Sequence, residues 1–263
     1  MGHTRIGQIP KSKAWSDIVA LLNEEQSSIG LTPEQISAIA DASLLAAEEG
    51  FKKTIQDDGV CHSLYIITKI LESIATNDSK SRYYINIEDI KSSREFAFLI
   101  NRQIRTYLIE NNISSDKSEL AQRALINSIL SSTRPDQHSL LGDSDNQEKI
   151  NIKELASKKG FANLSHNFFA LYANYYTNFF ISKITSYSTG INSIKNIEEL
   201  SNFNSQSQKH WNESASIVRE FSGTWFAKKV FYEKDLQIGT VKSFLKTALD
   251  KIVAETKTQR GDK

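Results

Sequence analysis

Basic side chains beside aromatic residues, or at predicted helix starts, are the strongest chemical signal in this sequence. Arg94, Arg102 and Arg105 fall within about 80° of one another on a predicted helix, opposite its apolar face. The candidate phosphate-binding residues are Arg94, Arg102, Arg105, Lys158, Lys159, Gly160, Lys228 and Lys229. Because cations neutralise phosphates and aromatic rings stack on bases, this pattern predicts a contact with single-stranded nucleic acid.

The start of a long aromatic run offers the sharpest of these sites. Lys158 and Lys159 stand at a predicted helix start, where the helix dipole disfavours cations unless an anion shares the site. Together with the backbone of Gly160, they could therefore hold a phosphate group. The plainer interpretation is an ordinary charged surface, because 32 basic residues are balanced by 31 acidic ones. The sequence leaves both interpretations open.

Two histidines stand where an enzyme could use them. His62 follows the only cysteine, Cys61, but adjacent helical residues point about 100° apart and cannot face each other. A buried, inert cysteine is therefore expected. His166 lies near a strip of asparagines on the aromatic helix and could serve as a general base in a polar cavity. A hydrogen bond to a neighbouring helix is the commoner role, and no catalytic residue is assigned.

Motifs for metals and cofactors are missing from the sequence. The histidines are His3, His62, His138, His166 and His210. No two of them share the i, i+4 spacing of a helical zinc site, and no CxxC pair occurs. Neither GxGxxG nor GxxxxGK[ST] is present, and the acidic segment 142–148 lacks EF-hand spacing. We therefore expect no metal and no cofactor.

The composition predicts a cytoplasmic globular protein. The chain has 263 residues, 39% of them hydrophobic, and a formal net charge of +1. This charge argues against attraction of the whole surface to nucleic acid or anionic membranes, although it is compatible with local basic patches. One cysteine excludes an internal disulfide and is typical of a cytosolic chain. The N-terminus lacks the apolar core of a signal peptide, and no membrane contact is expected.

The hydrophobic periodicity predicts an all-α fold of roughly eight to ten helices around a central aromatic helix at about 161–185. Aromatic residues cover most of the circumference of that helix, which is typical of a buried helix. Further helices are predicted at about 12–25, 33–56, 60–75, 92–108, 117–130, 152–157, 194–200 and 210–221, and from Thr240 onward. Gly50 is expected to lie inside the helix that ends near residue 56, whereas Gly223 is expected to interrupt a helix.

The domain organisation is predicted as one helical domain over 1–263. Its longest break is the polar segment 132–148, which contains Pro135 and Gly142. Two lobes, 1–131 and 149–263, joined by this loop are the alternative.

Three segments carry a resemblance to a known group. They read RIGQIPKSKAWSDIVALL from Arg5, SKKGFANLSHNFFALYANYYTNFF from Ser157, and IVREFSGTWFAKKVFYEKDLQIGTVKSFLKTALDKI from Ile217. In this order they resemble an uncharacterised group of bacterial all-helical proteins, whose gene clusters hold helicase-like or nuclease-like partners of the anti-phage defence kind. The resemblance implies a bacterial multi-protein system as the context. It assigns no activity and no site residue.

These observations predict a non-enzymatic helical subunit or adaptor whose partners are other protein subunits. The first alternative is a nucleic-acid-binding module that uses Lys158, Lys159 and the arginine stripe. The second alternative is an enzyme with a polar site around His166.

Overall fold

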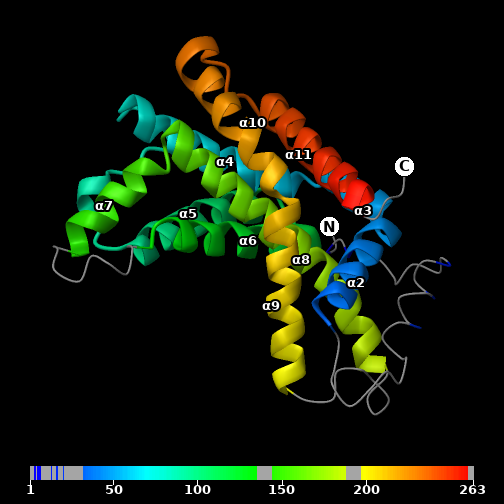
Figure 1. Cartoon of the computed structure of the whole chain (residues 1–263). Helices are drawn as coiled ribbons and strands as arrows, with labels where there is room; N and C mark the ends of the chain where they lie inside the picture. The colour runs from blue at the N-terminus through cyan, green and yellow to red at the C-terminus, as the bar shows by residue number, and fades with distance from the viewer. Residues whose placement is uncertain are drawn as a thin grey trace.

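A 30-residue helix, α8 (Lys158–Tyr187), runs through the molecule, and other helices pack along it (Figure 1). The computed structural model describes residues 32–134, 144–187 and 197–259, together with His3, Arg5, Ile6, Lys13, Ser16 and Ala20. Regular structure in these residues is helical, without strands, so the prediction of an all-α fold around a central aromatic helix is confirmed.

The rings of α8 form the centre of the core. Phe168, Phe169, Tyr172 and Tyr176 are almost completely buried, because helices pack on several sides of α8 at once. The Tyr172 hydroxyl lies 3.1 Å from the Thr54 hydroxyl, so this polar atom keeps a hydrogen bond inside the core.

The remaining helices differ in length, and four of the α-helices begin with a side-chain cap. Those before α8 are α2 (Pro33–Ala46), α3 (Glu48–Lys52), the 3₁₀ turn η1 (Lys53–Gln56), α4 (Asp58–Thr76), the 3₁₀ turn η2 (Ile87–Asp89), α5 (Ser93–Glu110), α6 (Asp116–Ser132) and α7 (Ser144–Glu154). Those after it are α9 (Ile197–Ser214), α10 (Ser216–Ala227), the π-helical turn η3 (Lys228–Glu233) and α11 (Ile238–Gln259). Thr32, Asp57, Ser92 and Ser115 cap α2, α4, α5 and α6 by accepting backbone N–H groups.

Several predicted boundaries were wrong. The helix expected to continue to residue 56 breaks at Ala47 (φ −103°, ψ 11°). This change of direction brings Phe51 to ring-centroid distances of 6.0 Å from Tyr172 and 5.2 Å from Tyr176. The polar segment 132–148 is shorter than predicted, because α7 already begins at Ser144. The helices predicted separately at 194–200 and 210–221 are also wrong in their bounds, because α9 runs without a break from Ile197 to Ser214. The helix predicted at 12–25 lies almost entirely outside the described residues.

Gly223 does not interrupt a helix, contrary to the prediction. It lies inside α10, where a side chain would place its Cβ 2.3 Å from the carbonyl oxygen of Lys158 and 3.1 Å from the Cβ of Ala162. The glycine therefore lets α10 approach α8 closely. As a result, Phe226 stacks on Phe161 at a centroid distance of 4.3 Å.

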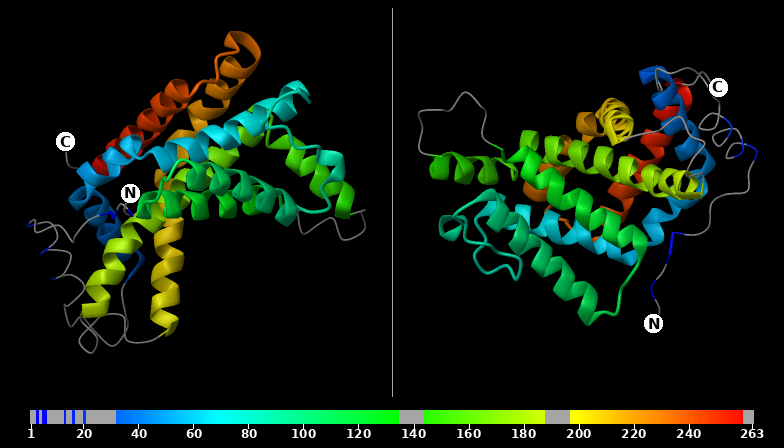
Figure 2. Two further views of the ribbon diagram at one scale, coloured as in Figure 1. Left: turned by 180° about the vertical axis from the view of Figure 1, so that it is seen from behind. Right: turned by 90° about the horizontal axis from the view of Figure 1, so that it is seen from below.

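Helices from the two halves of the chain are interleaved. α2 packs on α9 and α11, α4 packs on α11, and α6 packs on α8 (Figure 2). Each half therefore covers apolar surface of the other. Among the described residues, no helix combines the length and the apolar character needed to cross a membrane.

Candidate anion-binding face on helix α5

One side of α5 is buried, and the opposite side presents arginines together with large apolar residues. Helical spacing places Arg94, Phe98, Arg102, Arg105 and Ile109 along the exposed side, which is called the α5 face below. Phe98 is 63% exposed and Ile109 is 71% exposed. The sequence predicted the arginine part of this face, and the structure shows that an aromatic ring stands among the guanidinium groups.

The arginines of the α5 face have no ion-pair partner among the described residues. Arg94, Arg102 and Arg105 form no hydrogen bond or ion pair with other residues that the structure describes. Many surface lysines of the same molecule do: Lys52 lies 2.7 Å and Lys257 lies 2.9 Å from the carboxylate of Glu48. The arginines of α5 are thus available to an external anion.

A pocket of about 320 Å³ opens beside this face. Its walls come from α4, from the segment between α4 and η2, and from α5. The lining residues are Ile66, Arg82, Tyr83, Arg102, Gln103, Thr106, Tyr107 and Glu110. Arg102 therefore belongs both to the α5 face and to the pocket.

Two tyrosine rings in this pocket are held by their neighbours. The Arg82 guanidinium carbon lies 5.0 Å from the centroid of the Tyr83 ring, and His62 stacks on Tyr107 at a centroid distance of 4.5 Å. Burial raises the pKa of both tyrosines, so their hydroxyls stay protonated and can donate hydrogen bonds. Sequence reasoning assigned none of Arg82, Tyr83 and Tyr107 to a site. Alternating apolar residues from Tyr83 onward suggested at most a short strand, and helical spacing placed Tyr107 on the core face of the helix predicted at 92–108.

The predicted lysine pair at the end of α10 is neutralised. Lys228 lies 3.0 Å from the Glu233 carboxylate, and Lys229 pairs with the same carboxylate within η3. An anion would have to compete with Glu233 for both cations, so this pair is the weaker candidate for phosphate binding.

The predicted phosphate site at the start of α8 has its backbone donor already engaged. The Gly160 N–H donates to the Ser157 hydroxyl at 2.9 Å. A side chain at residue 160 would place its Cβ 1.9 Å from the carbonyl oxygen of Glu154, so the sharp corner between α7 and α8 explains the glycine. Lys158 and Lys159 are exposed, and neither lines the pocket beside α5. Phosphate binding at Gly160 stays a prediction.

His166 connects α8 to α9 and α10. Its Nε2–H donates to the Asn212 carbonyl at 2.7 Å, and its Nδ1 accepts from Arg219 at 2.8 Å, an arrangement that fits the neutral imidazole. Burial, with the Arg219 guanidinium as a further cause, lowers the pKa of His166 below its usual 6.5. Both ring nitrogens are thus occupied by protein groups, which supports the structural role of this histidine.

His166 should make folding stability depend on pH. Because its pKa is lowered in the native state, the unfolded chain binds a proton more readily below about pH 6.5, and stability falls as the pH drops through that value. Replacing His166 with Gln keeps a donor for the Asn212 carbonyl but removes the titration. We expect the loss of Tm between about pH 7.5 and pH 5.5 to be smaller in His166→Gln than in the wild type. Equal losses in both proteins would contradict this assignment.

Cys61 and His62 point apart, as expected from helical geometry. The Cys61 thiol is buried and donates to the Ile55 carbonyl at 3.3 Å, while His62 donates to the Asp58 carbonyl at 2.8 Å. Burial raises the pKa of the Cys61 thiol to about 11, so the thiolate nucleophile is disfavoured. In the part of the chain that the structure describes, no three or more His, Cys, Asp or Glu side chains lie close enough together to hold a metal ion.

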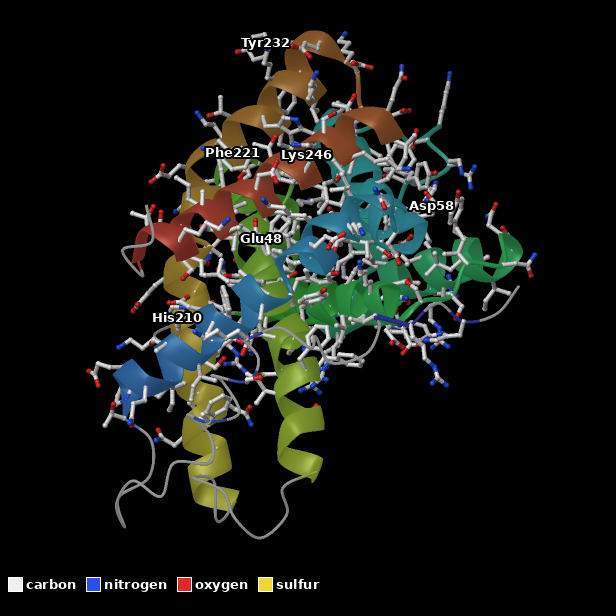
Figure 3. All side chains as sticks on the ribbon, turned by 90° about the vertical axis from the view of Figure 1, so that its right-hand side faces the viewer. Glu48, Asp58, His210, Phe221, Tyr232 and Lys246 are labelled. Carbon is white, nitrogen blue, oxygen red and sulfur yellow. The ribbon has the colours of Figure 1, made fainter. Side chains whose placement is uncertain are left out.

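A buried pair that sequence reasoning missed connects α2 to α9. His210 Nε2 lies 2.7 Å from the Asp41 carboxylate, and both side chains are buried. Figure 3 shows His210 where α9 crosses α2. The two residues are 169 positions apart, so no local spacing could have indicated the contact.

Comparisons with protein-family models, curated proteins and solved structures found no match for this chain.

Proposed function

We propose that the protein is a non-enzymatic helical subunit that binds single-stranded nucleic acid along the α5 face. The observation that carries the proposal is the set of three unpaired arginines around the exposed ring of Phe98. Guanidinium groups bind phosphates through paired N–H donors, and an exposed aromatic ring can stack on any base. From Arg94 to Arg105 the face extends about 16 Å along the helix axis, enough for several successive phosphates.

The near-zero net charge of the chain limits the expected affinity for nucleic acid and its salt dependence. With a net charge of +1, attraction is confined to the local face, so affinity should be moderate and should depend on few contacts. Three phosphate contacts predict a log–log salt slope of about −2 for a single strand.

Removing the arginines should abolish most of this salt dependence. We expect Arg94→Ala/Arg102→Ala/Arg105→Ala to weaken binding of a labelled oligo-dT or oligo-U and to move the salt slope from about −2 towards zero. Fluorescence anisotropy at a series of salt concentrations measures both quantities. Phe98→Ala should weaken binding without changing the slope, because stacking releases no counterions.

The matched control is Lys158→Ala/Lys159→Ala, which removes exposed, unpaired cations away from α5. It should leave the slope unchanged. If this control moves the salt slope towards zero by more than one unit while the arginine variant does not, nucleic acid binds at the start of α8 instead. An oligonucleotide that binds none of these proteins at low salt would contradict the proposed function altogether.

A second candidate function is that of an adaptor for other protein subunits. Phe231 is 48% exposed and Tyr232 is 82% exposed, and Figure 3 shows Tyr232 at the outer end of the molecule. Exposed aromatic residues of this kind are enriched in protein interfaces. The resemblance to bacterial proteins of defence-type gene clusters fits either function.

A tagged purification from a bacterial host separates the two candidates. Partners that remain at moderate salt after nuclease treatment, and that are lost with Phe231→Ser/Tyr232→Ser, would support the adaptor. Nucleic acid that copurifies with the wild type and is lost with the arginine variant would support the α5 face.

A further inference from the structure

We infer that the pocket beside α5 holds a single nucleotide unit, with its phosphate at Arg82 and Arg102 and its base against the tyrosines. This inference deepens the proposed function, because it names the chemical unit that the nucleic-acid face would recognise. It rests on the proposed function only where it states that the bound nucleotide is part of a single-stranded nucleic acid. The pocket itself can be tested with free nucleotides.

The phosphate end of the site is formed by two arginines from different segments. Arg82 precedes η2 and Arg102 lies on α5, yet both line the same pocket. Neither forms an ion pair with another described residue, although Glu110 also lines the pocket. Because both guanidinium groups belong to the pocket lining, a phosphate bound there could accept hydrogen bonds from both.

The base end of the site is formed by aromatic and amide groups. Tyr83 and Tyr107 are partly buried and line the pocket, with Arg82 over one face of the Tyr83 ring and His62 on one face of the Tyr107 ring. A nucleobase would pack against the parts of these rings that line the pocket. The Gln103 amide and the Thr106 hydroxyl make no hydrogen bond to other described residues, and both line the pocket. Together they supply donors and acceptors for the edge of a base.

The volume of the pocket suits one nucleotide. At about 320 Å³ it lies near the lower end of the range of about 300–1,000 Å³ that small-molecule sites occupy. Because Arg102 is shared with the α5 face, a strand that follows this face would pass the pocket mouth. One of its nucleotides could then leave the stack and enter the pocket.

The direct test is isothermal titration calorimetry of the full chain with AMP and UMP, and separately with inorganic phosphate and with adenosine. We expect a nucleoside monophosphate to bind more tightly than phosphate or nucleoside alone. Arg82→Ala, which leaves the α5 face intact, should weaken this binding at least about tenfold. Gln103→Ala should weaken the binding of one base more than that of the other.

The matched control is Arg134→Ala, since Arg134 is exposed after the end of α6 and belongs neither to the α5 face nor to the pocket lining. It should leave AMP and UMP affinity unchanged. Far-UV circular dichroism melts confirm that each variant is folded before its titration is interpreted.

The outcomes separate the inference from the proposed function. AMP or UMP binding that disappears with Arg82→Ala, in a protein that binds no oligonucleotide, supports the pocket and overturns the nucleic-acid face. Oligonucleotide binding that is unaffected by Arg82→Ala, with no saturable AMP or UMP binding, overturns the pocket and leaves the face standing. Inorganic phosphate that binds as tightly as AMP and UMP also overturns the inference, because the tyrosines would then contribute nothing.

Discussion

Gly160→Ala should destabilise the protein by about 3 kcal/mol or more, because the added methyl group would overlap backbone atoms. Its Cβ would lie 1.9 Å from the carbonyl oxygen of Glu154 and 2.7 Å from the Cα of Leu155. No side-chain rotation can relieve this overlap, so the corner between α7 and α8 has to open. Opening that corner would also move Phe161 away from Phe226, on which it stacks.

The measurement is thermal unfolding followed by circular dichroism, where such a loss lowers Tm by roughly 6–12 °C. Gly239→Ala is the matched control. Gly239 also lies in a helix, but a Cβ there would have no atom within 4 Å, so this variant should be as stable as the wild type or slightly more stable. Equal melting temperatures for the two variants would show that the close approach at Gly160 is not tight in solution.

Asp41→Ala should cost about 3 kcal/mol of folding free energy, because it leaves the buried His210 ring without its partner. Asp41→Asn keeps an acceptor oxygen at the same position and should cost less. Asp250→Ala is the exposed control. Asp250 lies 2.6 Å from Lys246 on the surface of α11, where an ion pair contributes about 0.3–0.5 kcal/mol.

Chemical denaturation of the single and double variants measures the coupling between Asp41 and His210. We expect Asp41→Ala/His210→Ala to lose less folding free energy than the sum of the losses in the two single variants. Each single variant leaves the other side chain buried without its hydrogen-bond partner, whereas the double variant removes both side chains. Strictly additive losses would mean that the two side chains do not stabilise each other.

The parts of the fold that follow from local patterns could be predicted. The aromatic spacing of α8 indicated a buried central helix, and the helix starts predicted at about residues 33 and 92 agree with the caps that the structure shows at Thr32 and Ser92. The same reasoning placed Arg94, Arg102 and Arg105 on one exposed side of α5. These inferences need only the helical period and the residue types near each helix start.

The parts that depend on distant contacts could not be predicted. Apolar periodicity continues through Ala47, so nothing local indicates the break that lets Phe51 reach α8. Gly223 was expected to end a helix because glycine favours breaks, whereas here it allows two helices to approach closely. The pocket beside α5 needs Tyr83 and Tyr107 from different elements, and only the tertiary fold brings them together.

The contact between Asp41 and His210 also constrains how the chain matures on the ribosome. His210 is synthesised 169 residues after Asp41, which at about 5–20 residues per second takes roughly 8–34 s. Throughout that interval α2 has neither α9 nor α11 to cover it, so its apolar side and the Asp41 carboxylate are exposed to solvent. We therefore expect the nascent chain to need chaperones that bind unfolded segments until α9 has been synthesised.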